Sequence, residues 1–322
     1  MASRPRFSRL RRTLLAALVA ASVAVPVSGA ARPAAVPAPA PVALAPLRAA
    51  TPAALAERYA ANRQGIRAAE RMAGEHGDRR RARALRAMAD PARHFLRFDG
   101  RDGGRTAEVF GDLSRAGTIA VLVPGSDTGL DTYERFRAGA VALREQLGDR
   151  AAVVAWLGYR TPGTVSPEVL TPGLAQHAAP RLRSFMAELA QVKPAARTSL
   201  LCHSYGSVVC ALAARDLWVA DIVLYGSPGT GVDTVGALHT PAAVWAGRGT
   251  GDWIAAVPHV RIRVPFLSVG FGTDPVSRTF GAHTFDAGAA GHSGYLQPGS
   301  VALRNIARIV SEGHPTEEGR HA

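Results

Sequence analysis

The segment "TSLLCHSYGSVVCALAA", Thr198–Ala214, joins two apolar runs through a short polar stretch. The first run is typical of a buried strand and the second of a helix, and no loop separates them. A strand that passes directly into a helix needs a sharp turn, which would hold the Ser204 hydroxyl clear of the sheet and strain its backbone. The turn departs from the pattern G-x-S-x-G only at Cys202, which stands in place of the first glycine. Cys202 is small enough for the close approach of strand and helix, and Gly206 satisfies the other flank.

Strand-like and helix-like segments alternate on both sides of this turn at the spacing of βαβ units. The strands are predicted at 94–99, 105–110, 118–125, 151–159, 197–203, 221–229 and 242–254, with 278–285 as a candidate last strand. Helices are predicted at 57–71, 80–88, 133–147 and 174–192, and from residues 205 and 300. Continuously apolar strands favour an α/β fold with a mostly parallel, doubly wound sheet and flanking helices. The sequence lacks G-x-G-x-x-G after the first strand and G-x-x-x-x-G-K-[ST], which disfavours the nucleotide-binding versions of this architecture.

Residues 1–30 have the pattern of a secretion signal peptide. Five arginines precede an apolar run, Thr13–Val27, which is followed by Ser28-Gly29-Ala30. The run is too short to span a bilayer, and small residues suit a cleavage site, although an uncleaved anchor is the alternative. Arg11-Arg12 also resembles the twin-arginine export pattern. We therefore expect a protein that is secreted or held in the cell envelope, with a mature chain that starts near Ala31.

The remaining chain divides by composition. Residues 31–50 are rich in alanine and proline and predict an extended, solvated linker. Residues 51–92 predict an N-terminal helical extension, residues 93–312 the α/β domain, and residues 313–322 a disordered tail.

The net charge of +13 could indicate a nucleic-acid partner, but its distribution argues against a specific one. Five of the arginines belong to the predicted signal peptide, and many others lie in "DRRRARALRAM", Asp78–Met88. The favoured interpretation of that run is a solvated helix face. A weak association with an anionic cell-envelope surface is the alternative.

The chain contains two cysteines, Cys202 and Cys210. In an exported protein a pair suggests a disulfide. One would end a strand and the other would lie inside the next helix, so we expect a bridge to distort the junction. Two small buried thiols are therefore predicted.

Ser204 is the candidate nucleophile, with a structural serine as the alternative. A serine hydroxyl needs a base, and in this architecture the acid and the histidine follow it in that order. Asp252 ends a predicted strand, where it could orient a histidine or simply cap a helix. Asp274 is the alternative acid, and Asp233 is a weaker one.

The candidate base is His292, which lies in the glycine-flanked loop "AAGHSGYLQPGS" after the last predicted strand. Such a loop could carry the ring over the serine, although a structural hydrogen bond is the alternative role. His283 lies inside a predicted strand. His203 adjoins the serine, but its side chain should point to the opposite side of the strand.

A tetrahedral oxyanion would need backbone donors. The N–H of Tyr205 is one by its position after the nucleophile, and the second should follow the strand "TIAVLVPG", at Gly125 or Ser126. An ordinary strand-ending turn is the alternative for Gly125.

Six further motifs occur in order along the chain, and together they carry a family resemblance. They are "VLVPG", "VVAWLGY", "HSYGS", "LYGSPGTGVD", "VWAGRGTGDWI" and "GHSGYLQPGS". The chain resembles the actinobacterial α/β-hydrolase family long catalogued as a domain of unknown function, over roughly residues 55–312. The resemblance implies an α/β-hydrolase fold, with Ser204 as nucleophile, Asp252 as acid and His292 as base. The family's usual "GHSYGS" is "CHSYGS" here.

These observations predict an exported serine hydrolase, carboxylesterase-like, that cleaves a small-molecule ester or acyl substrate through an acyl-enzyme. No metal or organic cofactor is needed for that chemistry. Two alternatives stay open: an amidase or peptidase that uses the same residues, and a non-catalytic cell-envelope binding protein on a hydrolase scaffold. The segment 160–173 follows a strand at the catalytic rim and could cover the site, although it is short for a lipase lid.

Overall fold

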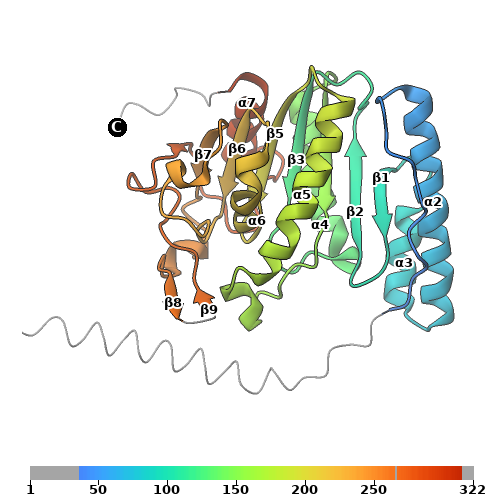
Figure 1. Cartoon of the computed structure of the whole chain (residues 1–322), viewed down its shortest axis with the longest axis horizontal. Coiled ribbons are helices and arrows are strands. Elements are labelled where there is room, and N and C mark those ends of the chain that lie inside the picture. Colours follow the sequence, from blue (N-terminus) through green and yellow to red (C-terminus); the bar gives the residue numbers. More distant parts are fainter. Residues whose placement is uncertain (1–35, 265–266, 314–322) are drawn as a thin grey trace, which may run out of the picture.

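The computed structural model describes residues 36–264 and 267–313 (Figure 1). The predicted signal peptide, residues 1–30, lies outside the described residues, as does the predicted tail apart from Gly313. Within the described residues, no helix is both long and apolar enough to cross a membrane.

An eight-stranded sheet runs through the molecule in the order β1-β2-β4-β3-β5-β6-β7-β10. The pairings between β4 and β10 in this order are parallel, while β1 with β2 and β2 with β4 are antiparallel. The strands are β1 (His94–Asp99), β2 (Arg105–Phe110), β3 (Thr118–Val123), β4 (Ala151–Leu157), β5 (Arg197–His203), β6 (Asp221–Tyr225), β7 (Ala243–Gly247) and β10 (His283–Thr284). A separate antiparallel pair consists of β8 (Ile262–Val264) and β9 (Leu267–Val269), which the sequence did not predict.

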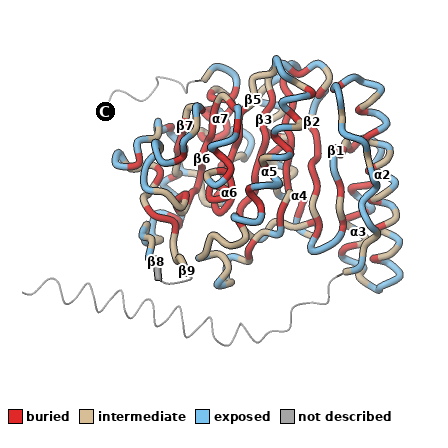
Figure 2. Tube along the Cα trace, viewed as in Figure 1, coloured by how far each residue is buried: buried red, intermediate tan, exposed pale blue. Residues whose placement is uncertain are grey.

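Helices cover both faces of the sheet, because its central strands are apolar on both sides. On one face lie α5 (Gly173–Val192) and α6 (Gly206–Ala213), and on the other lie α4 (Tyr133–Leu147) and α7 (Val301–Glu312). Figure 2 shows the central strands as buried along their length. The predicted doubly wound α/β architecture is thus confirmed. Short 3₁₀ helices η1 (Leu130–Thr132), η2 (Pro167–Leu170), η3 (Ala214–Asp216), η4 (Val235–Leu238) and η5 (Trp253–Ala256) occupy the connections.

The N-terminal segment packs beside the edge strand β1. Helices α2 (Pro52–Glu75) and α3 (Arg79–Met88) begin at the capping side chains of Thr51 and Asp78, respectively. Their buried side chains Ile66 and Leu85 belong to the same apolar cluster as Phe95 of β1. Residues 36–50 are extended, as expected, but several of their side chains contact the domain; Leu47, for example, packs against its core.

The sheet order places a topological switch point between β3 and β5, because the chain leaves β3 for β4 on one side and returns to β5 on the other. Ligand sites of open α/β sheets lie outside the carboxyl ends of the strands at such a point. Val123 pairs with Cys202 in the β3–β5 register, so the residues that follow these two strands are neighbours.

Candidate active site

Ser204 lies at a strained turn between β5 and α6. Its φ angle is 51°, in the left-handed region that a non-glycine residue seldom adopts, and its N–H donates to the Tyr225 carbonyl oxygen at 3.1 Å. The helix must start close to β3: a Cβ on Gly206 would lie 2.7 Å from the carbonyl oxygens of Val123 and Pro124. Glycine at 206 therefore permits the close crossing that turns the Ser204 side chain out of the sheet.

Ser204, His292 and Asp252 lie together although they are far apart in the sequence. The His292 Nε2 is 2.9 Å from the Ser204 Oγ, and its Nδ1 is 2.9 Å and 3.1 Å from the two Asp252 carboxylate oxygens. Because a carboxylate only accepts hydrogen bonds, Nδ1 carries the proton and Nε2 is left to accept from the serine hydroxyl. This arrangement can move a proton from serine to histidine and hold the resulting imidazolium.

Asp252 is buried between β7 and η5, and its carboxylate accepts hydrogen bonds from three donors. It accepts from His292, from the Ile254 N–H at 2.9 Å and from the Tyr295 hydroxyl at 2.5 Å. Burial on its own would raise the pKa of Asp252, but the hydrogen bonds from His292, Tyr295 and Ile254 outweigh it and lower that pKa below its ordinary value. Asp252 thus caps η5 and faces His292 at once, so the two roles considered from the sequence are compatible.

Two residues at the site were not assigned a role from the sequence. Tyr295 donates to Asp252 and accepts from the Gly249 N–H at 3.1 Å, which ties the His292 loop to the end of β7. The His203 Nε2 donates to the His292 carbonyl oxygen at 2.7 Å. Burial, together with the nearby His292, lowers the pKa of His203 to about 4. The sequence offered one signal for Tyr295, which is its place in "GHSGYLQPGS". For His203, the alternation of side chains along the strand predicted that it points away from Ser204, but not that it would contact His292 there.

The loop after β3 lies directly against Ser204. A Cβ on Gly125 would be 2.6 Å from the Ser204 Cβ, so the candidate donors at Gly125 and Ser126 adjoin the serine from one side. Tyr205 adjoins it from the other, at the start of α6. The Tyr205 hydroxyl donates to the Thr171 carbonyl oxygen at 2.8 Å, and burial raises the pKa of this hydroxyl to about 12.

Hydrogen bonds clamp this β3 loop to the segment after β4. The Asp127 N–H donates to the Pro162 carbonyl oxygen at 3.0 Å, and its carboxylate accepts from the N–H and hydroxyl of Thr164. The Thr161 hydroxyl accepts from the Thr128 N–H at 3.1 Å and donates to the Thr128 carbonyl oxygen at 2.8 Å. The 160–173 segment is therefore fastened beside the serine at both ends, through Asp127 and through Tyr205.

The alternative acids and the competing histidine make other contacts. Asp274 pairs with Arg248 at 2.6 Å, and Asp233 pairs with Arg261 at 2.6 Å. His283 lies on β10, where its ring is 4.8 Å from that of Trp245. The carboxylate that His292 Nδ1 contacts among the described residues is that of Asp252.

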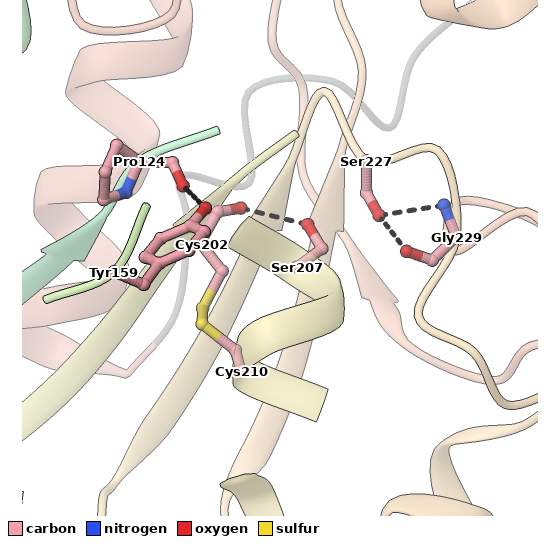
Figure 3. The surroundings of a disulfide bond; sticks show 7 residues. All are labelled: Pro124, Tyr159, Cys202, Ser207, Cys210, Ser227 and Gly229. Atoms are coloured by element: carbon pink, nitrogen blue, oxygen red, sulfur yellow. Dashed lines mark hydrogen bonds between the residues drawn. A yellow bond between two sulfur atoms is a disulfide. The ribbon is translucent and has the colours of Figure 1, made fainter. Parts of the chain in front are cut away.

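Cys202 and Cys210 form a disulfide, so the prediction of two free buried thiols is wrong (Figure 3). Helix α6 turns back along β5 and places Cys210 over the sheet face from which Cys202 projects. Their Cα atoms are 6.4 Å apart, within the range that a disulfide spans. The bridge therefore joins strand and helix without opening the turn at Ser204, and the expectation that it would distort the junction fails.

Comparisons with known proteins agree with this architecture. The model of the alpha/beta hydrolase family matches residues 99–262, about half of the chain, which includes Ser204 and Asp252 and ends before His292. An uncharacterized protein of Mycobacterium tuberculosis is 33% identical over 178 residues, and so is one of Mycobacterium bovis. That match covers 48% of this chain and 66% of each relative, slightly less than two thirds of their length.

Solved structures with similar folds include a serine hydrolase without a lid from Xanthomonas campestris and the esterase LipW from Mycobacterium marinum. The first has a TM-score of 0.44 and 18% identity, over 70% of this chain and 97% of that one. The second has a TM-score of 0.41 and 17% identity, over 84% of this chain and 95% of that one. The extent of the family match, together with the sheet order and the turn at Ser204, shows that the chain belongs to the alpha/beta hydrolase family.

Proposed function

We propose that this protein is an exported hydrolase that cleaves carboxylic esters through an acyl-enzyme on Ser204. The observation that carries the proposal is the hydrogen-bonded series Ser204 Oγ, His292 and Asp252, which begins at a nucleophile with a φ of 51°. In this family a strained serine at a strand–helix turn is the position from which attack on a carbonyl takes place.

The reaction needs no group beyond the described residues and water. His292 Nε2 takes the Ser204 proton while Oγ bonds to the ester carbonyl carbon, and the carbonyl oxygen becomes an oxyanion. When the intermediate collapses, the C–O bond to the alcohol breaks and His292 returns the proton to the leaving alcohol. Water then attacks the acyl-enzyme by the same route, releasing the carboxylic acid and restoring Ser204. Asp252 holds the ring in the required tautomer throughout, because its carboxylate accepts from Nδ1.

The backbone N–H groups of Tyr205 and of Gly125 or Ser126 are the proposed oxyanion donors. The supporting observation is their position on either side of Ser204, with Gly125 in contact with it. Such donors stabilise charge that develops in the transition state, and losing one typically costs about 3–4 kcal/mol.

Two features support export. Residues 1–30 have the pattern of a signal peptide, and the Cys202–Cys210 disulfide is of a kind that persists in oxidising compartments outside the cytosol. Expression of the full chain in a bacterial host should yield a processed protein in the envelope or medium that starts near Ala31. Retention of the intact chain in the cytosol would contradict export.

The test of the hydrolase is labelling of the full chain with a fluorophosphonate, combined with turnover of p-nitrophenyl butyrate. Ser204→Ala should abolish labelling and lower kcat on the order of 10⁶-fold, as removal of the nucleophile does in a comparable triad. The matched control is Ser207→Ala, one turn further on, whose hydroxyl donates to the Cys202 carbonyl oxygen and should be dispensable for chemistry. Labelling that survives Ser204→Ala, or a folded protein that neither labels nor turns over, would refute the proposal.

A further inference from the structure

Exposed apolar side chains gather on the side of the molecule where Ser204 lies. Among the described residues, eight large apolar side chains are exposed, and five of them follow the carboxyl ends of β4 and β7. Because the central strands are parallel, these connections share one edge of the sheet with the serine. We call these five side chains the apolar rim: Val165, Leu170, Trp253, Val260 and Ile262.

The apolar rim reaches the candidate active site at Trp253. The Trp253 ring is 4.6 Å from the His292 ring and directly follows Asp252. The Leu170 carbonyl oxygen accepts from the Gly270 N–H at 2.9 Å, which joins the segment before α5 to the segment that carries β8 and β9. Figure 1 shows these two segments beside each other at the lower edge of the molecule.

Three ion pairs lie among the charged side chains at this edge. Arg160 pairs with Glu168 at 2.8 Å, Arg248 with Asp274 at 2.6 Å, and Arg261 with Asp233 at 2.6 Å. These pairs neutralise six of the charged side chains near the apolar rim. Exposed apolar side chains that gather at one edge in this way are typical of an interaction site.

The segment 160–173 forms a wall of the site and not a cover that must open. Its hydrogen bonds to Asp127, Thr128 and Tyr205 hold it beside the serine. Val165 projects from this fastened segment and is 80% exposed. Apolar side chains held in this way can enter an acyl layer while the backbone that supports them stays fixed.

We propose that the apolar rim docks on a neutral lipid surface and that the site takes long-chain acyl esters from it. The proposal rests on the hydrolase function above and names its substrate class. Insertion of the rim removes apolar area from water, and it brings the ester group of an embedded lipid to Ser204 beside Trp253.

The fluorescence of Trp253 can report docking in a protein that cannot catalyse the reaction. The chain has four tryptophans, of which Trp156 and Trp245 are buried, so in a Ser204→Ala/Trp218→Phe protein the exposed one is Trp253. Adding neutral phosphatidylcholine vesicles should shift its emission to shorter wavelength and sediment the protein with the vesicles. Unchanged emission and no sedimentation would overturn the proposal. Binding only to anionic vesicles, lost in salt, would overturn it too, because it would assign the attraction to the arginines.

Variants separate the rim from exposed apolar surface elsewhere. Val165→Ser/Ile262→Ser should lower the vesicle partition coefficient of the Ser204→Ala protein about tenfold or more, because two aliphatic side chains no longer leave water. Trp218→Ser is the matched control: Trp218 is 86% exposed but precedes β6, at the opposite edge of the sheet. It should leave the partition coefficient unchanged, and equal losses in the two proteins would refute the assignment.

Turnover distinguishes failure of this proposal from failure of the hydrolase function. Two turnover rates are compared in the otherwise native full chain: that of p-nitrophenyl palmitate in phosphatidylcholine vesicles and that of dissolved p-nitrophenyl butyrate. Val165→Ser/Ile262→Ser should lower the ratio of the first rate to the second about tenfold. An unchanged ratio in an active enzyme would refute the lipid surface alone. Absence of butyrate turnover and of fluorophosphonate labelling would refute the hydrolase function instead.

Discussion

His203 adjoins Ser204 in sequence, but its side chain makes its contacts on the other side of the strand. Its ring lies between Tyr225 and His292, with centroid separations of 5.1 Å and 4.9 Å, and its Nε2 holds the His292 carbonyl oxygen. The residue that precedes Ser204 therefore supports the loop that carries His292. A positive charge there would be buried beside His292, which is why its pKa falls.

Because His203 is buried, we expect the stability of the protein to depend on pH through its protonation. Its pKa is about 4 in the folded chain and 6.5 when unperturbed, so between these values the unfolded chain binds more protons. The free energy of unfolding should fall as the pH drops from 6.5 towards 4, by up to about 3 kcal/mol, and this cause adds no further loss below pH 4. Urea unfolding from pH 7 to pH 4 measures the effect. His203→Gln should flatten the curve, while His177→Gln, at an exposed position of α5, should keep it; identical curves for all three proteins would contradict the assignment.

Residue order indicated which three side chains to consider as a candidate triad, but not which residues hold them in place. Ser204 could be recognised because its turn needs small neighbours, and Asp252 and His292 because they follow it in the order that the fold requires. Tyr295 reaches Asp252 only because the loop after β10 folds back over the end of β7. Neither periodicity nor spacing encodes the path of such a loop.

At the scale of elements, the Cys202–Cys210 bridge fastens α6 to β5 beneath Ser204. The sequence shows a separation of eight residues, but whether they meet depends on the direction in which the helix leaves the turn. In the structure Gly206 brings the helix start against β3, and the helix then runs back along the sheet. We therefore expect the packing of this helix, rather than the disulfide, to set the conformation of Ser204.

Removing the disulfide should therefore lower stability more than activity. For a loop this short, Cys202→Ala/Cys210→Ala is expected to lower the free energy of unfolding by about 2.5 kcal/mol, because the unfolded chain regains the entropy of the open loop. Turnover of p-nitrophenyl butyrate at 25 °C should stay within about twofold, because helix packing against β3 and β5 still fixes the elbow. Thermal unfolding and initial rates of the two proteins measure this. A collapse of kcat in a folded double variant would show that the bridge itself shapes the turn.

The clamp between the loop after β3 and the segment after β4 predicts a positioning role for Asp127. Its φ is 57°, and its carboxylate holds the N–H and hydroxyl of Thr164. Asp127→Ala should lower kcat about tenfold or more with a smaller change in KM, because displacement of the Gly125–Ser126 donors weakens oxyanion binding in the transition state.

Two further variants separate the side chain from the backbone. Asp127→Asn tolerates the left-handed backbone and can still accept from Thr164, so it should recover most of the activity. Asp127→Gly relaxes the backbone but removes the acceptor, so it should stay slow. Recovery in Asp127→Gly and not in Asp127→Asn would show that the backbone angle alone matters. Steady-state kcat and KM on p-nitrophenyl butyrate provide the comparison.

The strands that were predicted correctly from the sequence are those buried on both faces of the sheet. The segments of β3, β4, β6 and β7 are largely apolar, as is Leu200–Cys202 within β5, because helices cover both faces of the sheet. That pattern is visible in the sequence. The β8–β9 pair was missed because its strands have three residues each and pair with each other outside the main sheet. The last strand, β10, is two residues long, so only a fragment of the predicted 278–285 is paired.

Over the whole molecule, the N-terminal segment is joined to the α/β domain by ion pairs that the sequence did not predict. Arg93, immediately before β1, pairs with Glu108 of β2 at 2.7 Å, and both side chains are almost fully buried. Arg81 of α3 pairs with Asp131 at 2.6 Å near the start of α4. The run around "DRRRARALRAM" therefore supplies an anchoring arginine as well as solvated ones, a difference that composition cannot show.

The buried pair predicts that Glu108 is critical for stability. Glu108→Gln leaves the Arg93 charge buried, with the more exposed Glu134 as its remaining partner, and should lower the free energy of unfolding by about 3 kcal/mol. The matched control is Glu70→Gln, because the Arg86 that pairs with Glu70 is 76% exposed and the loss should stay below about 1 kcal/mol. Glu108→Leu/Arg93→Met removes both charges and should recover much of the stability, since a buried ion pair replaced by apolar groups is often neutral. Urea unfolding at pH 7 compares the four proteins, and equal losses for Glu108→Gln and Glu70→Gln would show that the buried pair is not critical for stability.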